Sequence, residues 1–161
     1  MILVLDASPL ITLARIGSLA FLRQLADQVI IPEAVCMESV SRASGRPGSA
    51  EIAQAEWIAR KPVQNQADVM RLRARLGWGE AEAIVLAREI HADAVVLDDA
   101  TARQLAEQEG CRVVGLLGLL IEGKQRGLLV AVKPLLDAMR HGGFFISNDL
   151  YTTILRQATE E

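Results

Sequence analysis

Nitrogen and sulfur ligands are scarce in this sequence, which limits the kinds of metal or redox site it can build. Only two cysteines and two histidines occur among its 161 residues. Cys36 and Cys111 lie among apolar residues and do not stand at metal-binding spacing, so we expect reduced core residues and a cytoplasmic protein. His91 and His141 fall at expected helix ends, far apart in the chain. We therefore expect neither a histidine metal site nor a catalytic triad.

Long apolar runs are also absent. No uninterrupted run approaches the roughly 20 residues that span a membrane. The apolar start Met1–Leu5 is interrupted by Asp6 and lacks the basic region and long apolar core of a signal peptide. We therefore expect neither a secretion signal nor a membrane partner.

Aromatic residues make up only 4% of a chain in which 51% of the residues are hydrophobic. The core is therefore expected to be aliphatic, which suits layered α/β packing better than a small all-β barrel. The length fits one domain, residues 1–161, with room for a sizeable core.

Short apolar runs alternate with helical patterns along the chain. The runs Ile2–Leu5, Val29–Ile31, Ala94–Leu97 and Arg112–Val114 are typical of buried strands. Strands that alternate with helices at this spacing indicate a mainly parallel sheet covered on both faces. The predicted fold class is therefore α/β.

The central feature is the pair Asp98 and Asp99, which directly follows the strand Ala94–Leu97. In open parallel sheets, ligands bind at the carboxyl ends of the strands. Taken alone, Asp98 is explained by the simpler role of N-cap of a helix that starts near Ala100. Two adjacent carboxylates exceed what one cap needs, so we expect a further role for this pair.

Asp6 stands in the same position after the first strand. Ser8 is a good N-cap residue and Pro9 suits a first helical position, so we predict that the helix through about Arg15 is capped by Ser8. That assignment leaves Asp6 free for other chemistry, although a plain helix cap remains the alternative.

Two glutamates on predicted helices complete the candidate set. Glu38 lies one turn beyond Ala34 in a helix that starts at Pro32, where a solvated surface position is the alternative. Glu80 shares a face with Ala83 and Ile84, so we predict that it points inward, although a glutamate in the first helical turn also favours the helix dipole. Glu82 is offset by about 200° and is predicted to point away.

These acids predict an oxygen-only site, because no histidine or cysteine accompanies them and no glycine-rich phosphate loop is present. Such a site suits Mg²⁺ or Mn²⁺, hard cations that bridge to phosphate oxygens. The chemistry that fits is metal-assisted phosphodiester hydrolysis.

Four segments resemble, in order and spacing, the acidic motifs of PIN-domain ribonucleases, and the third resembles the Gly-Glu-Ala-Glu-Ala motif of the prokaryotic VapC-like toxin branch. They are Val4–Ile11, Pro32–Glu38, Gly79–Ile84 and Leu97–Arg103, and the likeness extends to the tail Gly143–Tyr151. The resemblance implies a PIN-like α/β/α sandwich and a Mg²⁺- or Mn²⁺-dependent endoribonuclease. It further implies the toxin of a type II toxin–antitoxin pair, a homodimer, and an antitoxin partner that blocks the acidic cleft.

The resemblance also assigns roles to individual residues. It places Asp6, Glu38, Glu80 and Asp99 around the metal, with Asp98 beside them and the Ser8 hydroxyl nearby. Glu80 departs from the commoner pattern, in which aspartate stands at this position, and this leaves the number of bound ions open. The main alternative is a catalytically inactive PIN-fold binding or regulatory protein. A small-molecule hydrolase is a third possibility, but no nucleophile stands in a recognisable loop.

Charge is compatible with an RNA substrate. The net charge is −3, and the five candidate acids outweigh it, so the remaining surface carries a small positive excess. Arginines of the Ser41–Ser49 loop and of the predicted helix Ala67–Leu76 are candidates for contact with an RNA backbone, with solvated surface as the alternative for the helix. The scarcity of aromatic residues argues against extensive base stacking.

Overall fold

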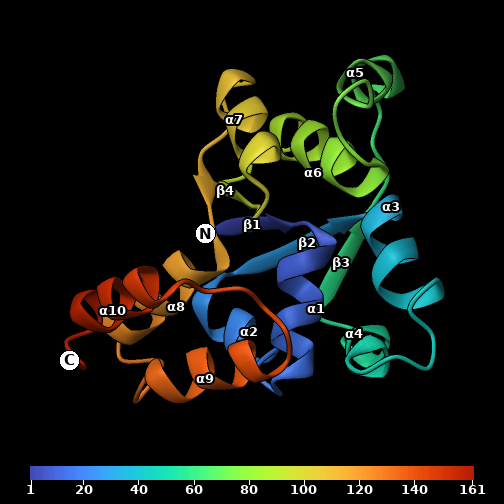
Figure 1. Cartoon of the computed structure of the whole chain (residues 1–161). Coiled ribbons are helices and arrows are strands. Elements are labelled where there is room, and N and C mark those ends of the chain that lie inside the picture. Colours follow the sequence, from blue (N-terminus) through green and yellow to red (C-terminus); the bar gives the residue numbers. More distant parts are fainter.

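The computed structural model describes residues 1–161 and contains one sheet of five parallel strands (Figure 1). The strand order is β3-β2-β1-β4-β5. The strands are β1 (Ile2–Leu5), β2 (Gln28–Pro32), β3 (Ile58–Lys61), β4 (Ala94–Val96) and β5 (Val113–Val114). The predicted α/β class and parallel sheet are confirmed.

Helices cover both faces of this sheet. The helices are α1 (Ala7–Arg15), α2 (Phe21–Leu25), α3 (Glu33–Cys36), α4 (Ser49–Gln54), α5 (Gln66–Leu72), α6 (Trp78–Glu89), α7 (Ala100–Gln108), α8 (Leu116–Gln125), α9 (Lys133–His141) and α10 (Asn148–Gln157), with one π-helical turn, η1 (Met37–Ser41). In Figure 1, α5, α6 and α7 lie on one face, and α1, α2, α4, α9 and α10 lie on the other. No helix is both long and apolar enough to cross a membrane.

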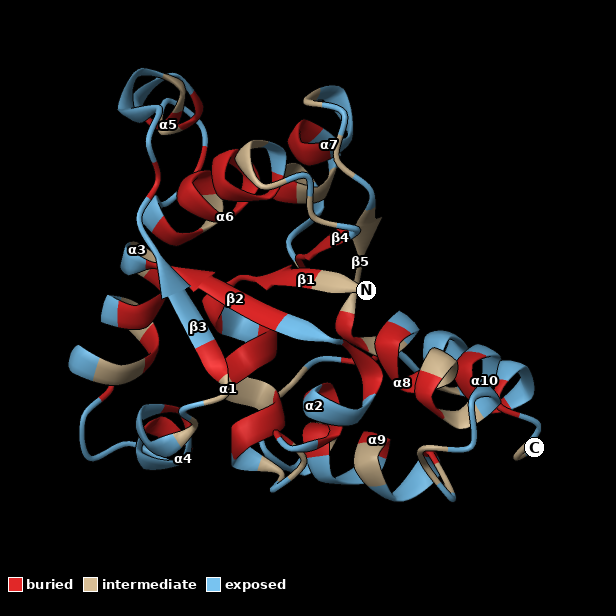
Figure 2. Ribbon diagram, turned by 180° about the vertical axis from the view of Figure 1, so that it is seen from behind, coloured by how far each residue is buried: buried red, intermediate tan, exposed pale blue.

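The two layers follow from the alternation of side chains along β1. Leu3 and Leu5 join a cluster of 29 buried residues with α1, α2 and the C-terminal helices. Val4 points the other way, into a cluster of 17 with α6 and α7. Figure 2 shows the mostly buried strands β1, β2 and β4 between two helical layers, while most of β3 is exposed. The core is aliphatic, as predicted.

β1 is the point at which the strand order reverses. It pairs with β2 on one side and with β4 on the other. In this register Leu5 lies opposite Val96, so the residues that follow these two strands emerge side by side at one edge of the sheet. Ligands bind outside the carboxyl ends of the strands at such a reversal point.

Several local expectations are wrong. α1 begins at Ala7, so Asp6, not Ser8, occupies the N-cap position, and Ser8 lies in the first turn. The helix predicted over Ala67–Leu76 ends at Leu72, because the chain turns there before it enters α6. Ser147 caps α10, since its side chain accepts the Leu150 N–H at 3.1 Å.

Candidate active site

A pocket of about 450 Å³ opens at the carboxyl edge of the sheet. Every candidate site residue from the sequence lines it, and the acids come from four separate segments: the β1–α1 junction, η1, α6 and the β4–α7 junction. These residues are Asp6, Ser8, Glu38, Glu80, Asp98 and Asp99. The fold therefore brings together residues that stand up to 93 positions apart in the chain.

Asp6 occupies the N-cap position of α1, but its side chain does not cap the helix. Its backbone is extended, as a cap requires, yet its side chain accepts no capping hydrogen bond, and Oδ1 is buried without any partner. Burial raises the pKa of this carboxyl to about 7; the Ala7 N–H opposes the rise, while repulsion from Glu80, Glu38 and Asp98 adds to it. A bound cation would therefore stabilise this buried carboxylate more than it would stabilise a solvated one.

Glu38 is held in place by the start of α6. It lies on η1, where the chain packs an extra residue into one turn, and such turns occur often at functional sites. The Gly79 N–H donates to Glu38 Oε1 at 3.0 Å. A Cβ on Gly79 would lie 2.8 Å from the same oxygen, so a larger residue there would force the end of the flexible Glu38 side chain to shift.

Glu80 points into the pocket, as predicted, and is half-buried. Burial raises the pKa of its carboxyl, the Gly77 N–H at 3.3 Å opposes the rise, and repulsion from Asp99 and Glu38 adds to it. Glu80 thus accepts a hydrogen bond at the start of its own helix and also lines the pocket.

Glu82 does not point to solvent, contrary to the prediction. It is buried, and its Oε1 accepts the Ala34 N–H at 2.8 Å. The expectation failed because α6 is covered on all sides: every residue from Ala81 to Ala87 is buried. Glu82 therefore ties α6 to the start of α3 and does not line the acidic pocket.

The two adjacent aspartates divide the available roles. Asp99, not Asp98, caps α7, since its Oδ2 accepts the Ala102 N–H at 2.9 Å. Asp98 reaches across to α8, where its Oδ1 accepts the Leu116 N–H at 3.0 Å, and its Oδ2 is buried without a partner. Burial raises the pKa of Asp98, and the Leu116 N–H and the Arg103 charge oppose the rise.

The donor set fits a hard divalent cation. It consists of carboxylate oxygens and one hydroxyl, and two of the oxygens, Asp6 Oδ1 and Asp98 Oδ2, are buried and unpaired. No three of the side chains are arranged as a ready metal cage. Mg²⁺ is commonly held by one or two carboxylates while it keeps several waters, and this arrangement suits such binding.

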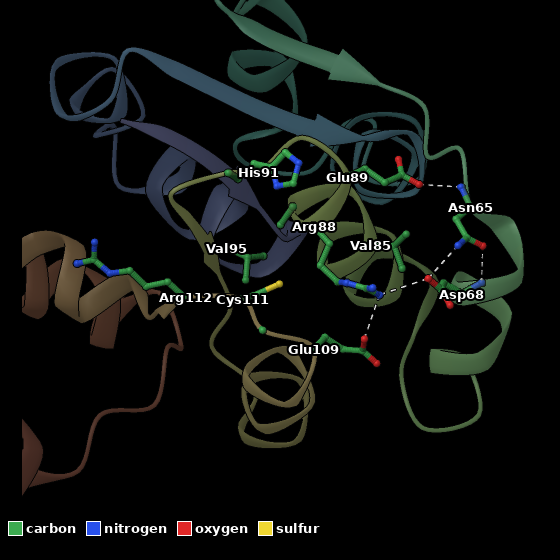
Figure 3. A pocket seen from close by; sticks show the side chains of 13 residues that line it. Asn65, Asp68, Val85, Arg88, Glu89, His91, Val95, Glu109, Cys111 and Arg112 are labelled. Carbon is green, nitrogen blue, oxygen red and sulfur yellow. Dashed lines mark hydrogen bonds and ion pairs between the residues drawn. The ribbon is translucent and has the colours of Figure 1, made fainter.

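A second, larger pocket lies toward the amino ends of β4 and β5 (Figure 3). Five of its polar residues are paired with each other: Arg88 bridges Asp68 at 3.3 Å and Glu109 at 3.0 Å, and Glu89 accepts the Asn65 N–H at 2.7 Å, whereas the side chains of His91 and Arg112 form no such pair. These pairs hold α5, α6 and α7 together and leave few groups for a ligand.

The arginine residues differ in whether their side chains form ion pairs with acidic residues. Arg71 belongs to the paired network, at 2.5 Å from Glu109, which favours the surface alternative over contact with RNA. Arg42 and Arg46 are exposed in the 42–48 turn, and Arg42 lines a hollow beside Glu38.

No sequence pattern predicts the backbone N–H groups that donate to the acids of the site. The backbone N–H groups of Gly77 and Gly79 both donate to site carboxylates, those of Glu80 and Glu38. The Leu116 N–H on Asp98 was also missed, although Gly115 before an apolar helix was a usable signal of a helix start.

Comparison with known proteins agrees with the fold. A family model described as “DUF3368: PIN domain” matches residues 2–160. A search of curated proteins gives no significant match. Among solved structures, the chain is similar to a PilT N-terminus domain protein from the hyperthermophilic archaeon Sulfolobus solfataricus P2. The TM-score is 0.53 at 16% identity, over 76% of this chain and 92% of the other. At this identity the likeness concerns the fold alone.

Proposed function

This chain belongs to the DUF3368 family of PIN domains, and from that premise we propose that it is a divalent-metal-dependent endoribonuclease. PIN domains are generally nucleases, and the whole chain is matched rather than a fragment of it. The dependence on a divalent metal, the preference for RNA and the biological role are our own proposals.

One observation carries the proposal: two buried carboxylate oxygens without partners, Asp6 Oδ1 and Asp98 Oδ2, border the same acidic pocket. Unpaired buried anions are costly unless a cation compensates them. Their place at the reversal point of a parallel sheet is where a ligand is expected.

The residues would divide the work as follows. Asp6 and Asp98 would hold the cation through their free oxygens, and Glu38, which Gly79 orients, would hold it or its waters. Glu80 would contribute its charge from the opposite wall, and Asp99 the carboxylate oxygen not used in the cap. The exposed Ser8 hydroxyl would orient a phosphate oxygen or a water.

When bound, Mg²⁺ or Mn²⁺ lowers the pKa of an attacking water and stabilises the leaving oxygen of a phosphodiester. The protein's own share is to fix the carboxylates before substrate arrives. The N–H groups of Gly79, Leu116 and Ala102 do this through hydrogen bonds to Glu38, Asp98 and Asp99.

We further propose that the protein is the toxin of a type II toxin–antitoxin pair and acts as a homodimer in the cytoplasm. The order and spacing of its four acidic segments support this branch of the family. Arrest of growth on expression, relieved by co-expression of the neighbouring gene's product, would test the toxin role, and light scattering would test the dimer.

The nuclease proposal is tested by cleavage of labelled mixed RNA with Mn²⁺, with Mg²⁺ and with chelator. We expect ion-dependent cleavage that disappears in Asp6→Asn and in Asp98→Asn. Glu51→Gln, which changes an exposed carboxylate on α4, is the matched control and should cleave at the normal rate.

Ion-dependent cleavage by Asp6→Asn at the wild-type rate would remove this residue from the site. No cleavage by folded wild-type protein that still binds the ion would favour the alternative of a non-catalytic PIN-fold binding protein.

A further inference from the structure

The large apolar side chains that remain exposed gather around the acidic pocket. Six such residues exist in the chain, and four of them line two hollows that adjoin the pocket. The four are Met37, Trp78, Phe145 and Leu150, and the other two, Met70 and Val130, lie outside these hollows. Apolar patches that remain exposed mark binding surfaces.

The first hollow, of about 200 Å³, contains Trp78 and shares Glu38 with the acidic pocket. The Arg73 guanidinium lies over the Trp78 ring, 4.1 Å from its centroid. The cation holds the indole in place, and 39% of the residue remains exposed. The ring therefore offers a fixed aromatic surface one residue before Gly79.

The second hollow, of about 660 Å³, shares Asp98 with the acidic pocket. Phe144 and Phe145 line it from the segment between α9 and α10, and Phe145 is 86% exposed. Arg103 and Gln104 of α7 form the opposite wall, where Arg103 donates to the Leu97 carbonyl at 3.0 Å.

The three cavities follow one edge of the sheet. The Trp78 hollow lies beyond the end of β2, the acidic pocket lies beyond β1 and β4, and the Phe145 hollow lies beyond β5. Three interstrand spacings of about 4.8 Å make this path roughly 14 Å long. A short stretch of extended polynucleotide would span it.

We propose that single-stranded RNA lies along this path, with a base on one side of the cleaved phosphate stacked on Trp78 and a base on the other side stacked on Phe145. The proposal rests on the nuclease function proposed above. Bases stack on exposed aromatic rings in single-stranded recognition, whereas a duplex keeps its bases stacked on each other. Three aromatic residues line the two hollows, Trp78 in the first and Phe144 and Phe145 in the second, so stacking of one base at each end is expected rather than extensive stacking.

A protein partner is a weaker occupant of the same surface. The two hollows mix apolar with charged side chains and are separated by a cavity lined with acids, whereas the core of a protein interface is apolar and depleted of charge. Arg42, at the Trp78 end, supplies a positive charge for a phosphate.

The test uses a short labelled single-stranded RNA and, as a second probe, a strand of the same length without bases. Binding is measured by fluorescence anisotropy in the Asp6→Asn background, so that cleavage does not interfere. We expect the strand without bases to bind at least about 5-fold more weakly, because each stacked base contributes this much or more.

Variants then locate the stacking. Trp78→Leu and Phe145→Leu should each weaken binding of the base-containing strand by about 5-fold or more, whereas Trp78→Phe and Phe145→Tyr should retain most of it. Val130→Ala, at an apolar position that is 96% exposed and outside the hollows, is the control and should bind normally.

Turnover separates this proposal from the nuclease proposal. If the protein cleaves RNA, the leucine variants should raise KM more than they lower kcat, because stacking holds ground state and transition state alike. Cleavage with unchanged KM, and equal binding by the leucine variants, would overturn the stacking path, leave the nuclease intact and assign the hollows to a protein partner. Base-dependent binding without cleavage would support the path and contradict the nuclease.

Discussion

At the scale of single residues, Asp6 has a backbone that is placed by the start of a helix and a side chain that remains available for the chemistry of the pocket. Its backbone starts α1, but its carboxylate makes no cap and is buried beside three other acids. The prediction that the Asp6 side chain does not cap the helix agrees with the structure, but its reason was wrong, because it assigned the cap to Ser8. A helix start can be placed only to within a residue or two from sequence, and here that margin decided which residue capped.

Asp6 makes the metal-free protein sensitive to pH. Its pKa is 3.8 in an unfolded chain and about 7 in the folded protein, so the folded state binds more protons between these values. The free energy of unfolding should therefore fall, by an amount on the order of a few kcal/mol, as pH rises from about 4 to 7. Urea unfolding at pH 5 and pH 8 with chelator measures this fall.

In Asp6→Asn this fall should be smaller, because one titrating group is gone while Glu80 and Asp98, whose pKa values burial also raises, remain. The variant should be more stable than wild type at pH 8 without metal. An unchanged pH dependence would show that other groups cause the destabilisation.

Gly79 is the residue whose size matters most to the pocket. A methyl group there would meet the Glu38 carboxylate at 2.8 Å, so Gly79→Ala should displace Glu38 and reduce cleavage at least about 10-fold. Stability should change little or rise, because alanine favours helices. Gly142→Ala, whose Cβ would lie 3.4 Å from the Ala138 carbonyl oxygen, is the control. Equal activity in both variants would show that Glu38 is free to move.

At the scale of elements, α6 carries two glutamates with different tasks. Periodicity placed Glu80 correctly but failed for Glu82, because a helix covered on all sides has no solvent face for the pattern to report. Glu82 is tolerated in this buried position because its carboxylate accepts the Ala34 N–H and so joins α6 to α3.

Glu82→Ala should therefore act on stability. Loss of the acceptor leaves a backbone N–H unpaired, which costs about 1–3 kcal/mol. Glu80→Gln should instead lower the cleavage rate with little change in stability. Chemical denaturation and initial rates for both variants test this division, and a larger loss of activity than of stability in Glu82→Ala would contradict it.

β4 and α7 meet at the two aspartates, whose order along the chain did not reveal their roles. Asparagine caps helices about as well as aspartate, so Asp99→Asn keeps the cap and removes only charge. Asp98→Asn alters the carboxyl group whose Oδ2 has no partner. We expect Asp98→Asn to reduce cleavage more than Asp99→Asn does; the reverse ranking would make Asp99 the principal ligand.

At the scale of the whole molecule, the sequence predicted the layers because strands and helices alternate with strong apolar patterns. It also predicted the acids of the pocket, because residues after parallel strands share one edge. It did not predict the strand order, the π-helical turn under Glu38 or the hollows beside the pocket. Those depend on packing between segments far apart in the chain, which no local pattern records.

Metal binding should stabilise the whole fold. A ligand present at 100 times its Kd adds about 2.7 kcal/mol to the free energy of unfolding. Mn²⁺ should thus raise the thermal midpoint of the wild type but not of Asp6→Asn or Asp98→Asn. Equal shifts in all three proteins would place the ion outside the acidic pocket.

The exposed turn over residues 42–48 divides the site into two covalent halves. Asp6 and Glu38 precede it, whereas Glu80, Asp98 and Asp99 follow it. The halves adhere through β1, which pairs with β4, and through β2, which pairs with β3. A chain cut in this turn would therefore be a natural candidate for fragment complementation: each piece is inert alone, and catalysis returns only when the two reassociate.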